Sequence, residues 1–118
     1  MPSDVVTIAP YFQVHPGRWP EVQAILRRFV EQTRPEPGCL YYDFTVNGDV
    51  VHCREAYQGA AGALAHLGNV NPLLQEMLQV ADLARLEIHG PAAELEALKA
   101  PLAALPVAWF TYACGLGR

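Results

Sequence analysis

The segment around Asn47-Gly48 constrains the fold of this chain more than any other. Two runs in which apolar and polar residues alternate, 40–46 and 50–57, flank a pair suited to the positive backbone angles of a two-residue turn. The pattern predicts an antiparallel hairpin, and moving the loop along by one residue keeps the same side chains on the same face. One face carries the following residues: Leu40, Tyr42, Phe44, Val51, Cys53, Glu55 and Tyr57.

Glu55 is the one charged member of that otherwise apolar face. A carboxylate removed from water destabilises the fold unless it is hydrogen-bonded, paired or protonated. His66 follows on the next predicted helix, three residues before Asn69. Glu55 and His66 are therefore the first residues in which we look for chemistry. They also allow a purely structural reading, in which the two side chains only satisfy each other and anchor a helix to the sheet.

The remaining periodicities predict alternating strands and helices. Strands are expected at 5–14, 83–89 and 107–113, and helices at about 18–33, at 59–67, from Asn71-Pro72 to about 80, and after Gly90-Pro91. This order predicts an α+β fold, a ferredoxin-like antiparallel sheet with helices on one face. We expect a single domain over 1–118, with a core at about 5–90 and a C-terminal helix and strand extension at 91–118.

Composition excludes several classes of function. The chain has 118 residues, a formal net charge of -4 and no basic run longer than Arg27-Arg28, so a nucleic-acid partner is not expected. Its apolar runs are short and broken by charges, which argues against a membrane-spanning helix. The first residues lack the features of a signal peptide, so we expect a cytoplasmic protein. The alternation sends Cys39 and Cys53 to opposite sheet faces, which predicts reduced thiols rather than a disulfide.

The other face of the predicted sheet mixes polar and aromatic groups, which suits a face-to-face homodimer. Two histidines and two carboxylates on this face also raise the question of a metal site. No compact ligand motif supports one, and Arg54 opposes a cation, so we expect an interface ion network and no metal. The members of this face are Tyr11, Gln13, Tyr41, Asp43, Thr45, His52, Arg54, Glu87 and His89.

The chain resembles the antibiotic biosynthesis monooxygenase family of dimeric α+β barrels. The resemblance rests on the opening strand and helix and on the segments 36–43, 54–57 and 65–67, and it covers roughly residues 5 to 90. It implies a homodimer whose two sheets face each other, with a pocket between sheet and helices in each subunit. Members include cofactor-independent oxygenases of polycyclic phenols and anthrones, quinol oxygenases and haem-degrading enzymes, so the fold alone does not name the reaction.

Cofactor-independent oxygenation needs a base that removes a proton and leaves an anion able to pass an electron to oxygen. We predict Glu55 and His66 as catalytic residues, and Tyr42, Tyr57 and Asn69 as substrate-binding residues for a small aromatic, phenolic or quinone-like compound. No cofactor is expected. Haem needs an axial histidine, and the helix beginning at Pro72 has none. The alternative function is a non-catalytic small-molecule-binding or stress-response dimer of the same fold.

Overall fold

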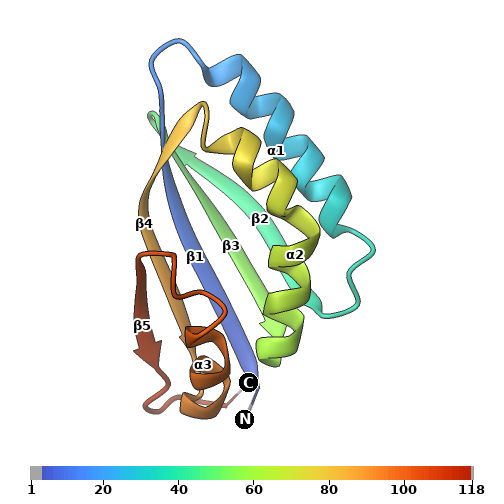
Figure 1. Ribbon diagram of the computed structural model, residues 1–118, viewed down its shortest axis with the longest axis vertical. Helices are drawn as coiled ribbons and strands as arrows, with labels where there is room; N and C mark the ends of the chain where they lie inside the picture. The colour runs from blue at the N-terminus through green and yellow to red at the C-terminus, as the bar shows by residue number, and fades with distance from the viewer. Residues whose placement is uncertain (1–3, 118) are drawn as a thin grey trace.

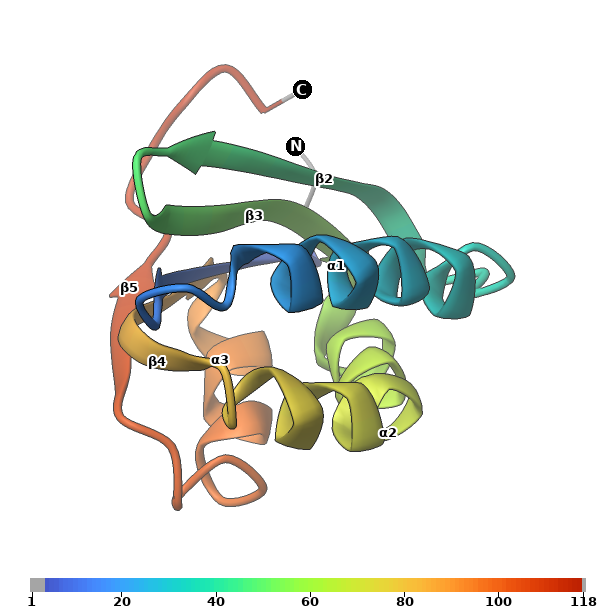
Figure 2. The same cartoon turned by 90° about the horizontal axis from the view of Figure 1, so that it is seen from above.

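The computed structural model describes residues 4–117 as one five-stranded sheet with helices against one of its faces (Figure 1). α1 and α2 lie side by side over this inner face, and α3 lies beside β4 and β5 (Figure 2). The elements in chain order are β1 (Val5–Val14), α1 (Trp19–Thr33), β2 (Cys39–Asn47), β3 (Val50–Gln58), α2 (Gly59–Met77), β4 (Ala81–Gly90), α3 (Ala92–Lys99) and β5 (Val107–Thr111).

The strand order is β2-β3-β1-β4-β5, which confirms the predicted ferredoxin-like α+β fold. The fifth strand, β5, is added at the β4 edge of the sheet. The pairs β2–β3, β1–β3 and β1–β4 are antiparallel, whereas β5 pairs with β4 in parallel. The pattern along the chain left the pairing of the last strand open. A strand that returns through a helix can lie parallel to the strand before it, and α3 makes that connection here.

Apart from Leu40, which lies at a register shift and is 46 % exposed, the hairpin has the predicted faces, with Gly48 and Asp49 as its two-residue loop. Gly48 has a φ of 60°, a conformation that glycine adopts without the steric cost that a side chain adds. Tyr42 therefore faces Glu55. The predicted placement of Cys39 and Cys53 on opposite faces was wrong. A register shift between Cys39 and Tyr41 puts Cys39 opposite Tyr57, on the inner face.

α2 is one continuous helix, so the prediction of two helices separated at Asn71-Pro72 was wrong. A proline inside a helix costs about 3 kcal/mol because it removes a hydrogen bond and crowds the preceding turn. The residues that α2 buries occur before and after Pro72, so both halves pack the same stripe against the sheet. Burial along this stripe offsets the cost of the proline. The buried side chains include Ala63, His66, Val70, Leu73 and Met77.

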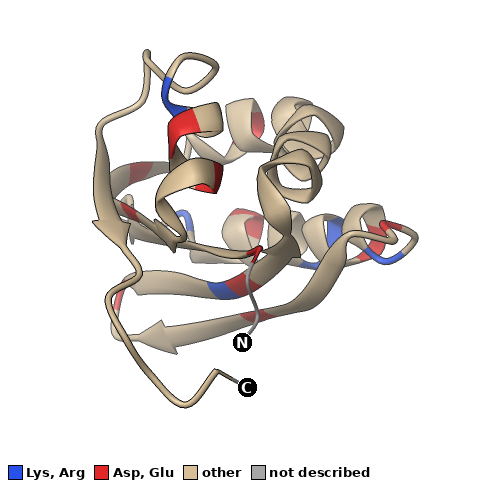
Figure 3. Cartoon of the chain, turned by 90° about the horizontal axis from the view of Figure 1, so that it is seen from below, with Lys and Arg blue, Asp and Glu red and all other residues tan. Residues whose placement is uncertain are grey.

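The hydrophobic core fills the layer between the inner sheet face and the helices. One cluster joins β1, α1 and the end of α2, and includes Phe12, Phe29 and Met77. A second joins β1, the start of α2 and α3, and includes Ile88 and Leu98. Lys and Arg are scattered over the elements rather than gathered on one face (Figure 3). Within residues 4–117 no helix is long and apolar enough to cross a membrane.

Candidate active site

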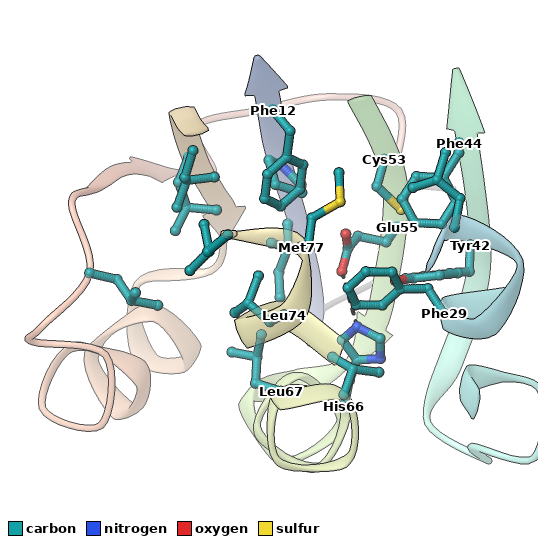
Figure 4. Close-up of a pocket in the computed structure, with 18 residues that line it drawn as sticks. Phe12, Phe29, Tyr42, Phe44, Cys53, Glu55, His66, Leu67, Leu74 and Met77 are labelled. Carbon is teal, nitrogen blue, oxygen red and sulfur yellow. Dashed lines mark ion pairs between the residues drawn. The ribbon is translucent and has the colours of Figure 1, made fainter. Parts of the chain in front are cut away.

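A cavity of about 80 Å³ lies between the inner sheet face and the two long helices (Figure 4). Such a volume is below the roughly 300–1,000 Å³ of sites for drug-sized ligands, so it fits a compact ligand or part of a longer one. Most of its wall is hydrocarbon, which excludes water and strengthens any charge interaction inside it. Apolar side chains in this wall include Ile8, Phe12, Phe29, Phe44, Leu86 and Met77.

The polar groups of the cavity gather at one end, where Glu55 points from β3 towards His66 on α2 (Figure 4). Glu55 occupies a position of β3 whose side chain points inward, so it lies in the core, where its side chain is 4 % exposed. Tyr57 lies behind it, fully buried, and donates a hydrogen bond of 2.6 Å from its hydroxyl to Glu55 Oε1. His66 Nε2 lies 3.6 Å from the same oxygen.

Burial raises the pKa of Glu55 from an ordinary 4.5 to about 7. The nearby carboxylate of Glu36 adds to this rise, whereas the hydrogen bonds from Tyr57 and Cys53 oppose it. A group with a pKa near 7 is populated in both protonation states at neutral pH, so it can accept a proton and return it. Burial and a raised pKa give Glu55 the electrostatic setting that a general acid–base group requires.

His66 links Glu55 to a second carboxylate. Its Nδ1 lies 3.0 Å from both carboxylate oxygens of Glu36, which is in the loop between α1 and β2. Its ring is close to those of Tyr42 and Tyr57, with centroid distances of 5.1 and 4.8 Å. Burial lowers the pKa of His66, and Glu36 opposes that shift. A neutral imidazole can donate from one nitrogen to Glu36 while the other faces the cavity.

Sequence reasoning did not include Glu36 among the site residues. The residue lies in the Pro35–Gly38 stretch that separates α1 from β2, where the pattern indicates only a turn. Its contact with His66 joins positions 30 residues apart. Local periodicity cannot predict such a contact, because the contact depends on how the loop and α2 pack together.

The three predicted substrate-binding residues occupy different positions. Tyr42 lines the cavity, and burial together with the charge of Glu55 raises its pKa, so its hydroxyl stays protonated and can donate. Tyr57 holds Glu55 from outside the cavity wall. Asn69 also lies outside the wall, where its Nδ2 donates to Glu36 Oε2 at 2.7 Å and its Oδ1 accepts from Gln32 at 2.8 Å.

The C-terminal extension also contributes hydrocarbon to the cavity wall. Leu105, from the segment between α3 and β5, lines the cavity together with Leu83 and Leu86 from β4. The sequence analysis did not place any residue of 91–118 at the site. No sequence motif surrounds Leu105, and it reaches the cavity only because α3 and β5 pack against β4.

The outer face of the sheet carries the second group of candidate residues as a set of pairs and stacks. His89 Nε2 lies 3.3 Å from Glu87, which Arg85 also contacts. The rings of Tyr11 and His52 stack with centroids 4.2 Å apart. Asp43 and Arg54 are opposite each other on the hairpin. No group of three or more possible metal-ligating side chains occurs in the described part of the chain.

Comparisons with known proteins agree with this architecture. The sequence model of the family described as antibiotic biosynthesis monooxygenase matches residues 5–69. The crystal structure of MupZ from Pseudomonas fluorescens is similar with a TM-score of 0.93 and 38% identity, covering 98% of this chain and 95% of MupZ. No curated protein gave a significant match.

More distant structures share the fold over part of this chain. Rv0793 from Mycobacterium tuberculosis has a TM-score of 0.67 at 21% identity, covering 75% of this chain and 95% of its own. A conserved protein from Methanosarcina mazei Go1 has a TM-score of 0.70 at 16% identity, with coverage of 75% and 94%. These two matches therefore leave a quarter of this chain unmatched, whereas the match to MupZ includes nearly all of it.

Proposed function

This chain belongs to the antibiotic biosynthesis monooxygenase family, and we propose that it is a cofactor-independent monooxygenase acting on a compact aromatic, phenolic or quinone-like molecule. The observation that carries the proposal is Glu55, a carboxyl group with a pKa of about 7 at the polar end of an apolar cavity. Such a group removes a weakly acidic proton at neutral pH, and the dry cavity keeps the resulting anion from being quenched by water.

The proposed reaction oxidises an activated methylene group. Glu55 removes one proton, and the carbanion transfers electrons to O2 and forms a carbon–oxygen bond. Protonation by Glu55 gives a hydroperoxide. Removal of the second proton then expels hydroxide, which leaves as water. The balance is CH2 plus O2 giving C=O plus H2O, so the substrate supplies all four electrons and no external reductant is consumed.

Each of the remaining polar residues has a different supporting role. Tyr42, which is protonated and in the cavity wall, donates a hydrogen bond to the oxygen on which the negative charge of the substrate anion develops. Tyr57 fixes the orientation of the Glu55 carboxyl through its 2.6 Å hydrogen bond. Asn69 acts through Glu36 rather than on the substrate, since its amide already bonds that carboxylate.

Oxygen uptake by the metal-free protein with anthrones, and with hydroquinones and catechols as phenols that lack an activated methylene group, tests the proposal. We expect substrate-dependent uptake that falls by roughly 10²–10⁴-fold in Glu55→Gln. Glu87→Gln, which changes a glutamate of the outer face, is the matched control and should retain uptake. Equal uptake in wild type and Glu55→Gln would remove the role assigned to Glu55.

An anaerobic arm separates proton removal from oxygenation. The same substrates are incubated with the protein in D2O, and deuterium incorporation at the reacting carbon is followed by NMR. Incorporation that requires Glu55, without oxygen uptake in air, would show acid–base chemistry of another reaction type and contradict the oxygenase proposal.

The second candidate is a binding protein of the same fold. Glu55 is supported by Tyr57 and His66 without any ligand, as a structural polar group in a binding cavity also requires. Saturable, stoichiometric binding of a panel compound with no turnover and no deuterium incorporation would favour this function over the oxygenase.

We also propose a homodimer formed by the outer sheet face. This face exposes aromatic side chains, including Tyr41 at 44 % and Phe110 at 42 %, which is the kind of surface that protein interfaces bury. Light scattering of the eluting protein should give twice the chain mass, and the double variant Tyr41→Glu with Phe110→Glu should elute as a folded monomer. A monomeric wild-type protein would contradict the proposal.

A further inference from the structure

Glu55 has no direct route to solvent along its own side chain, which is 4 % exposed. Its polar neighbours among the described residues are Tyr57, Cys53 and His66. Tyr57 and Cys53 are themselves buried, with exposed fractions of 0 % and 1 %. Glu55 takes up and releases a proton as it titrates, so a carboxyl group this deeply buried needs a path along which protons reach bulk water.

His66 supplies that connection, because it contacts a different carboxylate on each side of its ring. Nε2 faces Glu55 at 3.6 Å, and Nδ1 faces Glu36 at 3.0 Å. The Glu36 side chain is 10 % exposed and lines a depression in the molecular surface beside the end of α1. Tyr42 lines both this depression and the cavity, so its ring forms part of the wall that separates them.

Glu36 is also held in place from its far side. Asn69 Nδ2 donates to Glu36 Oε2 at 2.7 Å, and the same amide group bonds the carbonyl oxygen of Gln32 at 2.9 Å. With both carboxylate oxygens turned to His66 Nδ1, Glu36 favours the tautomer that carries its proton on Nδ1. The lone pair of Nε2 is then directed at Glu55.

We propose that His66 and Glu36 carry protons between the buried Glu55 carboxyl group and solvent, with Glu36 as the positioning residue that sets the His66 tautomer. The direction of transfer during a reaction rests on the function proposed above. The groups that surround His66 are Glu36 and Glu55, its two proton partners, and the phenols of Tyr42 and Tyr57.

The transfer balances over one turnover. After Glu55 takes a proton from the substrate, its O–H bond breaks as an N–H bond forms at His66 Nε2. The proton on Nδ1 passes to Glu36, which releases it to water. The acid step reverses this sequence: Glu36 returns a proton to Nδ1, Nε2 gives its proton to Glu55, and the ring regains its first tautomer. Closing the Nε2–Glu55 gap to hydrogen-bond length requires a shift of about 0.5 Å.

The tautomer of His66 is measured by ¹⁵N NMR of the imidazole nitrogens in the protein without substrate. The signals are assigned by their loss in His66→Gln. We expect wild type to carry the proton on Nδ1 and Glu36→Gln to lose that preference, because an amide can donate to Nδ1 as well as accept from it. Glu31→Gln, on the exposed side of α1, is the control and should leave the tautomer unchanged.

Asn69→Ala gives a second variant that keeps the carboxylate, and it should weaken the preference less than Glu36→Gln does. Either the opposite tautomer in wild type, or an unchanged tautomer in a folded Glu36→Gln, would overturn the assignment of Glu36.

Hydrogen–deuterium exchange of the Glu55 carboxylic acid tests the transfer itself. Infrared spectra below pH 7 follow its C=O stretch after transfer to D2O, and the band is assigned by its loss in Glu55→Gln. We expect exchange to slow by about tenfold or more in Glu36→Gln and not in Glu31→Gln. Equal rates in wild type and Glu36→Gln would overturn the relay. Neither readout uses turnover, so a failed oxygen-uptake experiment leaves both results interpretable.

Discussion

The two faces of the sheet carry the same kinds of ionisable residue with opposite consequences. On the inner face, burial raises the pKa of Glu55 to about 7. On the outer face, hydrogen bonds from Arg85 and then His89 lower the pKa of Glu87. The histidines differ in the same way, since the His66 side chain is 2 % exposed and that of His89 is 44 % exposed. Residue type is therefore a poor guide to chemistry unless burial and partners are known.

The difference follows from strand geometry and from the position of the helices. Alternate residues of a strand point to opposite faces, and α1 and α2 cover only one of them. Glu55, which faces inward, is 4 % exposed and is paired with Tyr57 and His66. Glu87, which faces outward, is 15 % exposed and is paired with the guanidinium of Arg85. Four predictions test this comparison.

The largest stability effect is expected from the pH dependence of Glu55→Gln. The pKa of Glu55 is about 7 in the fold, so the folded state binds this proton more tightly than the unfolded chain, with its ordinary 4.5. The stabilising effect is complete below pH 4.5 and is lost as pH rises through 7, at a cost of about 3 kcal/mol. Glu55→Gln removes that loss, so its stability relative to wild type should rise with pH in urea unfolding experiments.

Glu87→Gln is the control of opposite sign. Because the pKa of Glu87 is lowered in the fold, its contribution is present above the ordinary pKa of 4.5 and is lost as pH falls. The stability of this variant relative to wild type should therefore fall as pH rises. Parallel pH profiles for the two variants would contradict the contrast between the faces.

Replacing His66 and His89 in turn should show that the buried histidine contributes more to the stability of the fold than the more exposed one. His66→Ala removes a packed ring and leaves Glu36 and Glu55 without their common partner, at an expected cost of roughly 2–3 kcal/mol. His89→Ala should cost less than His66→Ala for the isolated chain, because its side chain is 44 % exposed whereas that of His66 is 2 % exposed. Urea midpoints compared at one pH test this, and equal losses would show that burial does not decide the effect.

Leu105→Ala tests whether the extension belongs to the inner face. Truncating this half-buried side chain enlarges the cavity at an apolar part of its wall and should cost about 1–2 kcal/mol. The cavity should then bind longer apolar ligands more tightly, as measured by titration calorimetry with a homologous series. Leu116→Ala is the control, since Leu116 is 83 % exposed. An unchanged ligand preference would place Leu105 outside the functional cavity.

The smallest effect is expected for the ion pair of Arg85 with Glu87. In the monomeric Tyr41→Glu, Phe110→Glu background, replacing Arg85 by Gln removes a contact whose guanidinium is mostly exposed, and exposed pairs contribute about 0–1 kcal/mol. The change should shrink further as salt is added, because screening weakens exposed charges. A loss larger than that of His66→Ala would contradict the contrast between the two faces.

Several features were predictable because they depend on neighbours along the chain. The alternation from 50 to 57 placed Glu55 on the inner face, and its burial is confirmed. The hairpin faces, β1 and the helix carrying His66 followed from the same periodicities. Two predictions failed where tertiary packing overrode local signals. Pro72 did not end α2, and the register shift near Leu40 moved Cys39 to the inner face.

The sequence by itself determined which side chains share a face and that Glu55 is the charged residue on the apolar face. Both follow from the periods of two residues in a strand and 3.6 residues in a helix, which depend only on neighbours along the chain. Only the tertiary structure decided that Glu36 meets His66, that Asn69 turns to Glu36, and that Leu105 reaches the cavity. Those contacts join residues distant in sequence and depend on how the elements pack. The pKa of Glu55 belongs to the second group, since it comes from the water that packing removes.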